Sequence, residues 1–185
     1  MTHQKVIVML GDSLTEYNRW DEAAPEAKVI NQGLSGDTTG GLFYRLNLTV
    51  HNRPDLIFLQ IGINDLSQGR TPEEIVAGHR RIWNALAERA PQAQLVVCSL
   101  APISDEKFNW SSGTISNNRV RATNDLLLEA VRQASLKYLD LYKPLSDESG
   151  TLPDEFTDDG VHLAAPAYEV WVATLKSFLA AFFKS

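Results

Sequence analysis

The sequence predicts an α/β domain built on a mostly parallel sheet. Apolar runs alternate with amphipathic segments along the chain, and this alternation is typical of a parallel sheet with helices on both faces. The apolar runs are nearly continuous, which indicates strands that are buried on both faces. A chain of 185 residues suits a single domain, residues 1–185, that buries a core of its own.

Five segments are predicted to be strands because they are short, apolar and partly β-branched. In chain order they are Lys5–Leu10, Lys28–Asn31, Leu56–Ile61, Leu95–Leu100 and the weaker Tyr138–Leu141. The single cysteine, Cys98, lies inside the fourth run. We interpret it as a small core residue rather than a nucleophile.

The predicted helices lie between and after these strands. Thr71-Pro72-Glu73-Glu74 combines a capping box with proline at the first helical position. Apolar residues then follow at helical spacing: Ile75, Ile82, Trp83, Leu86 and Ala90. Similar spacing predicts a helix through Val120–Ala134 and a last helix that begins near Pro166. A shorter helix is expected after Gly36-Asp37-Thr38-Thr39.

Composition and charge exclude several classes of function. The net charge is -6 and the pI is about 5.2, and no run of Lys or Arg offers the clustered basic surface that nucleic acid requires. No apolar stretch approaches the length of a membrane span. The apolar stretch within the first ten residues is too short for a secretory signal, and one cysteine cannot form an internal disulfide. We expect a soluble, cytoplasmic protein.

Polar segments with glycines follow the predicted strands. Gly11-Asp12-Ser13 ends the first strand, residues 31–39 follow the second, and Gly62-Ile63-Asn64-Asp65 follows the third. Ligands of parallel sheets bind outside the carboxyl ends of the strands. Taken alone, each segment is explained by a turn, because Gly, Asp, Asn and Ser are common turn residues.

Ester hydrolysis by a serine requires the residue types found in these segments and before the last helix. Ser13 is the candidate nucleophile, which needs a base to take its proton. His162 is the candidate base, since histidine titrates near the working pH. Asp159, three residues earlier, can orient the imidazole, whereas Asp158 is expected to cap the segment or to be solvated. The other histidines lie near the amino terminus, at a helix end and on a buried helix face: His3, His51 and His79.

The tetrahedral intermediate of such a reaction needs fixed donors around its negative oxygen. Gly36 can offer a backbone N–H that no side chain obstructs. Asn64 can offer its side-chain amide, and the backbone N–H of Ser13 is a third donor. The occurrence of all these residue types, in this order and at the ends of the predicted elements, favours a catalytic site over independent turns.

These residues lie in four blocks that resemble the SGNH hydrolase superfamily, the GDSL-type esterases and lipases. The blocks are Gly11-Asp12-Ser13-Leu14, Ser35-Gly36-Asp37-Thr38, Gly62-Ile63-Asn64-Asp65 and Asp159-Gly160-Val161-His162. The resemblance implies a three-layer α/β/α sandwich with a five-stranded parallel sheet, the flavodoxin-like fold of these hydrolases. It also implies catalytic Ser13, Asp159 and His162, with Gly36 and Asn64 completing the oxyanion hole. Gly33, three residues earlier, is the alternative to Gly36.

The expected function is hydrolysis of small or short-chain carboxylic esters through an acyl-enzyme, with no metal or cofactor. Alternatives are a lysophospholipase or thioesterase, a carbohydrate O-acetylesterase and, more remotely, an acyltransferase or a non-catalytic binding module. Specificity is expected in the loops after the third and fourth strands. Phe108 and Trp110 in residues 101–116 are candidates for lining a substrate pocket, and packing of the loop is the alternative.

Overall fold

The computed structural model describes residues 4–108 and 115–182. These residues form a five-stranded sheet with the strand order β2-β1-β3-β4-β5. All neighbouring strands pair in parallel, which confirms the predicted sheet. The strands are β1 (Val6–Gly11), β2 (Lys28–Gly33), β3 (Leu56–Gln60), β4 (Gln94–Cys98) and β5 (Lys137–Leu139).

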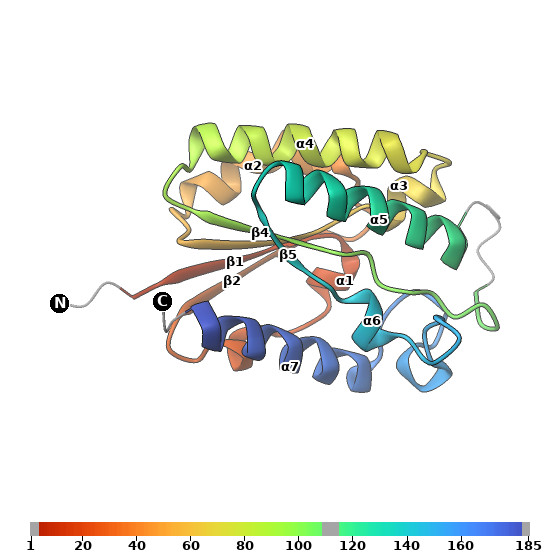
Figure 1. Ribbon diagram of the computed structural model, residues 1–185. Coiled ribbons are helices and arrows are strands. Elements are labelled where there is room, and N and C mark those ends of the chain that lie inside the picture. The colour runs from red at the N-terminus through yellow and green to blue at the C-terminus, as the bar shows by residue number, and fades with distance from the viewer. Residues whose placement is uncertain (1–3, 109–114, 183–185) are drawn as a thin grey trace.

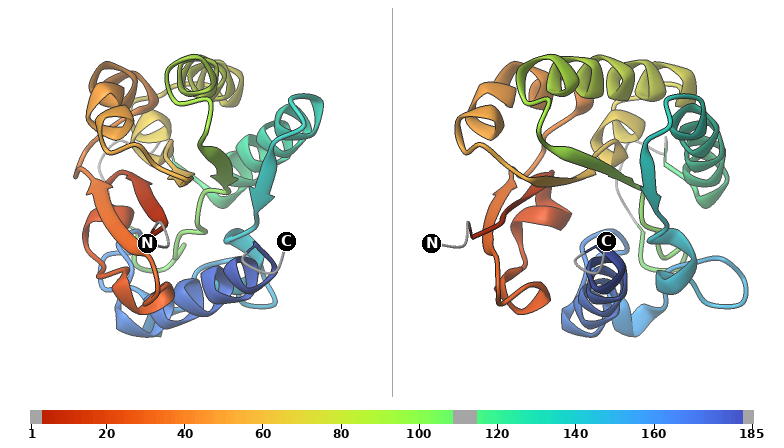
Figure 2. Two further views of the ribbon diagram at one scale, coloured as in Figure 1. Left: turned by 90° about the vertical axis from the view of Figure 1, so that its left-hand side faces the viewer. Right: turned by 60° about the vertical axis from the view of Figure 1, so that its left-hand side comes forward.

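Helices cover both faces of the sheet (Figures 1 and 2). One face is covered by α2 (Thr39–His51), α4 (Pro72–Arg89) and α5 (Asn117–Gln133), and the other by α7 (Ala165–Phe182). Short elements lie between them: α1 (Ser13–Glu16), η1 (Asp21–Ala23), α3 (Ile63–Ser67), α6 (Tyr142–Leu145) and η2 (Asp154–Phe156). This is the three-layer α/β/α arrangement that the family resemblance implied.

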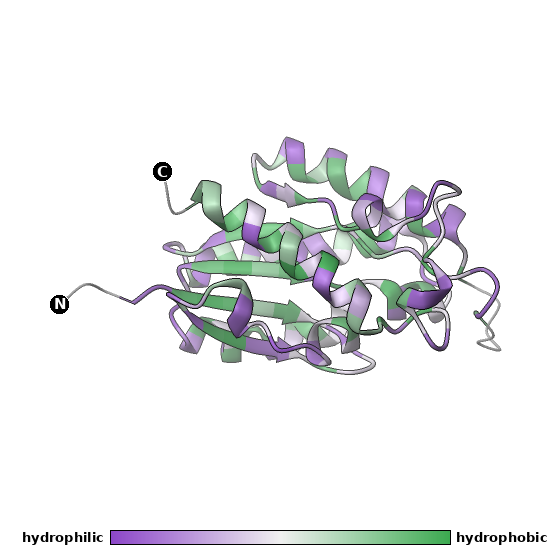
Figure 3. Ribbon diagram, turned by 90° about the horizontal axis from the view of Figure 1, so that it is seen from below, coloured by the Kyte–Doolittle hydropathy of each residue, from purple (hydrophilic) through white to green (hydrophobic). Residues whose placement is uncertain are grey.

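The central strands bury side chains on both faces, as predicted. Along β1, Ile7 and Met9 join the cluster beneath α7, whereas Val8 and Leu10 join the cluster beneath α2 and α4. Figure 3, a ribbon coloured by hydropathy, shows that the strands are largely made of hydrophobic residues. Adjacent residues point to opposite faces of a strand, so one short apolar run supplies both halves of the core.

The edge strand β2 is not buried on both faces, although the sequence predicted this for the strands. Its six residues are exposed or half-buried, because it pairs on one side only, with β1. The fourth strand also ends two residues earlier than predicted, at Cys98. Its chain leaves the sheet because both backbone groups of Leu100 bond the Asn124 side chain, at 2.8 and 3.0 Å, in place of a neighbouring strand.

The predicted capping box and core residues are present. The Thr71 side chain accepts from the backbone N–H of Glu74, whose carboxylate accepts from the backbone N–H of Thr71. His79 is fully buried on α4, and its Nε2 lies 3.0 Å from the carbonyl oxygen of Ile61. Cys98 is fully buried, and this burial raises the pKa of its thiol above the ordinary value.

Among the helices of residues 4–108 and 115–182, none combines the length and the apolar character that crossing a bilayer would require.

Candidate active site

Ser13 stands where the first strand gives way to a short helix. Asp12 directly follows β1, and its carboxylate oxygen Oδ1 accepts the backbone N–H of Leu14 at 3.0 Å. This cap makes Ser13 the first residue of α1, at the carboxyl edge of the sheet. Ser13 is only 4% exposed, so its hydroxyl group lies in a largely enclosed environment.

His162 and Asp159 come from the loop that precedes α7. Asp159 Oδ1 accepts the backbone N–H groups of Val161 and His162, at 2.9 and 2.8 Å. Asp159 Oδ2 lies 2.6 Å from Nδ1 of the His162 ring. One carboxylate therefore fixes both the turn and the imidazole that the turn presents.

Gly160 is required inside that turn. Its φ is +88°, in the region that favours glycine. A Cβ atom there would lie 2.5 Å from the backbone nitrogen of Phe108. The backbone of residues 104–108 is also bonded to this turn, since Ser104 N–H donates to the Gly160 carbonyl at 2.9 Å.

The ring of His162 reaches Ser13, which lies 149 residues earlier in the chain. Its Nε2 is 3.1 Å from Ser13 Oγ. An ionised carboxylate can only accept hydrogen bonds, so the proton between Asp159 and the ring belongs to Nδ1. Nε2 is then the nitrogen that can accept the proton of the Ser13 hydroxyl group.

The Asp159 side chain is held in its ionised form. Burial acts to raise the pKa of Asp159, but the hydrogen bonds from the His162 ring and from the backbone of Val161 and His162 outweigh it. The net pKa of Asp159 lies below its ordinary value. A negative charge therefore remains beside the ring nitrogen that would become part of an imidazolium.

Gly36 lies in the loop between β2 and α2, and Asn64 lies on the short helix α3 that follows β3. Gly36 has a φ of +76°, and a Cβ atom placed on it would meet nothing within 4 Å. Gly33 is enclosed by contrast, because a Cβ there would lie 2.1 Å from the backbone nitrogen of Glu16. Asn64 is buried on α3, and its Nδ2 donates to the carbonyl oxygen of Asp37 at 2.9 Å. The open surroundings favour Gly36 over Gly33 as a donor to a ligand.

Tyr17 is a neighbour of the site that the sequence analysis missed. Its ring centroid lies 5.4 Å from that of His162, and its hydroxyl group lies 3.1 Å from Ser35 Oγ. The Ser35 hydroxyl group also bonds the Glu16 carboxylate. Tyr17 is nevertheless 57% exposed, so it forms part of the rim of the site. The only signal in the sequence was its position four residues after Ser13.

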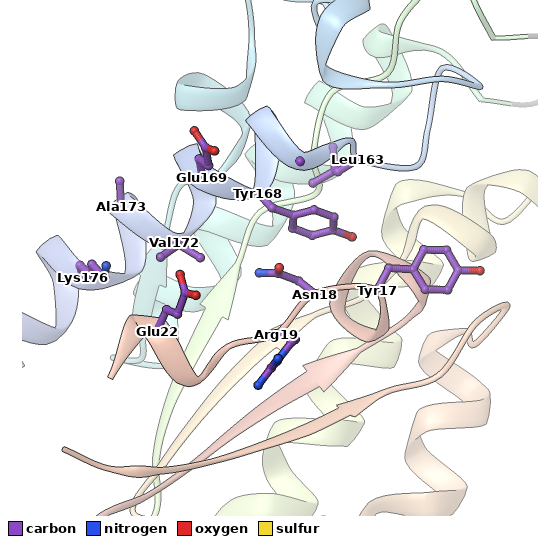
Figure 4. Close-up of a pocket in the computed structure, with 11 residues that line it drawn as sticks. Tyr17, Asn18, Arg19, Glu22, Leu163, Tyr168, Glu169, Val172, Ala173 and Lys176 are labelled. Atoms are coloured by element: carbon purple, nitrogen blue, oxygen red, sulfur yellow. The ribbon is translucent and has the colours of Figure 1, made fainter. Parts of the chain in front are cut away.

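A groove of about 620 Å³ begins beside Tyr17 and follows α7. Figure 4 shows Tyr17 and Leu163 at one end of this groove and Lys176 at the other. The groove adjoins the candidate base through Tyr17, whose ring lies 5.4 Å from that of His162, but Ser13 and His162 are not among its lining residues. Its size lies within the range of small-molecule sites.

The two aromatic candidates of the 101–116 loop have different outcomes. Phe108 is half-buried and packs against the cluster formed by the loops around α3 and the start of α5, which is the packing alternative. Trp110 lies outside the described residues. Asp158 is exposed, as expected. In residues 4–108 and 115–182, no three His, Cys, Asp or Glu side chains are grouped so that they could hold a metal ion.

Comparison with known proteins identifies relatives of this chain. It is 28% identical over 184 residues to platelet-activating factor acetylhydrolase IB subunit alpha1 of Homo sapiens, covering 94% of this chain and 74% of that protein. It is 27% identical over 168 residues to the alpha2 subunit of Gallus gallus, covering 88% of this chain and 70% of that protein.

Solved structures share the fold. A GDSL-like lipase from Bacteroides thetaiotaomicron has a TM-score of 0.81 at 19% identity, covering 96% of this chain and 88% of that one. The lipase/acylhydrolase from Enterococcus faecalis has a TM-score of 0.77 at 24% identity, covering 95% of each chain.

A family profile covers most of the chain. Residues 9–170 match the profile of the GDSL-like Lipase/Acylhydrolase family, which confirms the resemblance to the SGNH hydrolases. The chain therefore belongs to the GDSL-like lipase/acylhydrolase family, and this membership together with its named relatives indicates an ester hydrolase.

Proposed function

We propose that the protein is a serine esterase that hydrolyses small or short-chain carboxylic esters through an acyl-enzyme. The observation that supports this most directly is the line of contacts from Asp159 through His162 to Ser13, with distances of 2.6 and 3.1 Å. A hydroxyl group, a base and an orienting carboxylate in this order are the parts of a nucleophilic triad.

In the first half of the reaction, Ser13 Oγ attacks the ester carbonyl carbon while Nε2 of His162 takes the hydroxyl proton. A bond forms between Oγ and the carbonyl carbon, and the carbonyl oxygen becomes negative. When this intermediate collapses, the bond to the alcohol oxygen breaks. The proton held by His162 passes to the departing alcohol, and the acyl group stays on Ser13.

The negative oxygen would be held by the backbone N–H groups of Ser13 and Gly36 and by the side-chain amide of Asn64. The open surroundings of Gly36 and the buried, oriented amide of Asn64 support these roles. Loss of one such donor typically lowers the rate by about a hundred- to a thousandfold.

In the second half, water replaces the alcohol. His162 takes a proton from water as its oxygen attacks the acyl carbon, and the same donors hold the oxygen charge again. Collapse releases the acid and returns the proton to Ser13 Oγ. Transfer of the acyl group to another alcohol at this step would make the protein an acyltransferase instead.

The names of the relatives favour a short acyl group, because an acetylhydrolase releases acetate. The groove of about 620 Å³ beside Tyr17 and Leu163 gives room for the rest of the ester. Thioesters, lysophospholipids and acetylated sugars remain alternative substrates, and each belongs in the same assay.

The test is hydrolysis of a chromogenic acetate ester by the wild-type protein and by Ser13→Ala. Ser177→Ala, which removes an exposed hydroxyl group from α7, is the matched control. We expect Ser13→Ala to lose at least about a thousandfold in kcat/KM, and Ser177→Ala to lose nothing. A fluorophosphonate probe should label the wild-type protein at Ser13.

Two outcomes would contradict the proposal. If Ser13→Ala kept most of the activity, Ser13 would not be the nucleophile. If neither hydrolysis nor probe labelling occurred in the wild-type protein, the binding-module alternative would be favoured. The substrate preference is then ranked with esters of increasing acyl length, a thioester, an acetylated sugar and a lysophospholipid. Addition of a competing alcohol tests for acyl transfer.

A further inference from the structure

Arg45 is a largely buried arginine on α2 whose hydrogen bonds reach segments close in sequence to candidate oxyanion donors. Its side chain is 17% exposed. Its Nε donates to Asp37 Oδ2 at 2.6 Å, its Nη1 to the carbonyl oxygen of Gln32 at 2.9 Å, and its Nη2 to the carbonyl oxygen of Gly11 at 2.8 Å. All three nitrogens of one planar group therefore bind three separate segments of the chain.

Each of these segments leads to one of the proposed donors. Gly11 ends β1, two residues before the backbone N–H of Ser13. Gln32 lies near the end of β2, from which the chain runs into the loop of Gly36. Asp37 directly follows Gly36, and its side chain is only 6% exposed.

The third donor is connected through Asp37. The carbonyl oxygen of Asp37 accepts a hydrogen bond from Asn64 Nδ2 at 2.9 Å. An amide nitrogen carries two N–H groups, so this bond orients the side chain and leaves the second N–H to point elsewhere. The position of Asp37 thereby sets the direction in which Asn64 donates.

We propose that Arg45 is a positioning residue that holds the backbone of Ser13, the Gly36 loop and, through Asp37, the amide of Asn64 in one arrangement. The proposal rests on the function proposed above. The guanidinium group suits this role because its donors are fixed in one plane, whereas a lysine ammonium is a compact charge on a flexible stem.

A positioning role and a purely structural role predict different effects of losing the guanidinium group. Among the described residues, the hydrogen bonds of Arg45 go to Gly11, Gln32 and Asp37, and none goes to Ser13, His162 or Asp159. Loss of the guanidinium group should therefore leave the His162–Asp159 contact in place, while it shifts the donors of Gly36 and Asn64. We expect this displacement to lower kcat rather than to weaken substrate binding, because the donors act when negative charge develops on the carbonyl oxygen in the transition state.

The test is Arg45→Lys, which keeps the positive charge beside Asp37 but loses the planar group. We expect kcat for the acetate ester to fall by about a hundredfold, the effect typical of a displacement of about 1 Å. KM and the shape of the pH profile should stay nearly unchanged. Affinity for a boronic acid that mimics the tetrahedral intermediate should fall in parallel with kcat/KM.

Arg81→Lys is the matched control. Arg81 lies on α4 with its guanidinium carbon 4.4 Å from the centre of the Phe43 ring on α2, so this exchange disturbs the packing of α2 but leaves the three hydrogen bonds of Arg45 in place. We expect no change in its kcat. Equal losses in both variants, or a full kcat in Arg45→Lys, would overturn the proposal and leave the serine mechanism intact.

NMR of the labelled protein tests the positioning without activity. In Arg45→Lys, the backbone signal of Gly36 and the side-chain amide signals of Asn64 should shift, and the Asn64 amide should exchange faster with solvent. The downfield proton on His162 Nδ1 should stay in place. If the Ser13→Ala assay disproved the serine mechanism, these NMR signals would still show whether Arg45 positions Gly36 and Asn64. Unchanged Gly36 and Asn64 signals would refute the role of Arg45.

Discussion

Asp12 is a fully buried carboxyl group directly before the candidate nucleophile. Its Oδ1 accepts the backbone N–H of Leu14, and its Oδ2 has no hydrogen-bond partner among the described residues. Burial, assisted by the negative charges of Asp37 and Asp65, raises the pKa of Asp12 to about 7. The fold therefore favours the protonated form of this side chain.

The raised pKa of Asp12 makes the free energy of unfolding depend on pH. The folded protein holds a proton on Asp12 that the unfolded chain releases near its ordinary pKa. The protonated Asp12 contributes stability at low pH, and this contribution is lost as the pH rises toward about 7. Asp12→Asn keeps the acceptor for Leu14 but cannot ionise. Its free energy of unfolding relative to the wild type should increase by about 3 kcal/mol between pH 5 and pH 8.

Urea unfolding at several pH values measures this difference, because the groups distant from Asp12 titrate alike in both proteins. Asp125→Asn, at an exposed position on α5, should show no such trend. A constant difference between Asp12→Asn and the wild type across this pH range would mean that Asp12 is ionised in the folded protein.

The helix α4 begins with a reciprocal cap that the sequence predicted. Thr71→Ala removes the side-chain acceptor of the Glu74 N–H, which lies 3.3 Å away, and leaves a helix N-terminal donor to solvent. We expect a loss of about 1 kcal/mol in the free energy of unfolding. Because the cap lies on the surface, kcat for an acetate ester should stay unchanged well below the melting temperature.

Thr174→Ala provides the comparison for this measurement. The Thr174 hydroxyl group donates back to the carbonyl oxygen of Val170 inside α7, where no unpaired helix donor depends on it. Its melting temperature should fall less than that of Thr71→Ala. An equal fall in the two variants would show that removal of the threonine side chain, rather than loss of the cap, causes the effect.

The long elements could be predicted because their patterns repeat, whereas the short ones could not. The helix from Pro72 to Arg89 has a cap and several turns of regular apolar spacing. By contrast, α1 and α3 have four and five residues, too few for a period to appear. The conformation of single residues sets their starts: the Asp12 side chain caps α1, and Gly62 precedes α3 with a φ of +133°.

The residues of the candidate site also divide into those that could be predicted from the sequence and those that could not. Ser13, Asp159 and His162 could be named from the sequence because their side chains carry the expected chemistry, and the structure brings them within hydrogen-bond distance. Tyr17 and Arg45 could not, since Tyr17 lies beside the ring of the distant His162 and Arg45 bonds backbone carbonyl groups of distant segments. Such contacts depend on how the layers pack and leave no pattern in the sequence.

The assignment of the chain to one domain stays a prediction, and the shared sheet makes it testable. Leu46 on α2 and Leu175 on α7 are fully buried in the clusters on opposite faces of the same strands. Each Leu→Ala exchange should cost about 2–5 kcal/mol. Because every central strand contributes to both clusters, neither face can lose its packing without disturbing the other.

We therefore expect a single unfolding transition in Leu46→Ala, in Leu175→Ala and in the double variant, with helical signal and ester hydrolysis lost together. The two costs should add to within about 0.5 kcal/mol, because the two side chains lie in separate clusters on opposite faces of the sheet. Urea unfolding followed by circular dichroism and by activity provides both readouts. If Leu175→Ala lost the packing of α7 in a separate, earlier transition, the two faces would be independent units. Since His162 lies just before α7, hydrolysis would then disappear while most of the sheet remained folded.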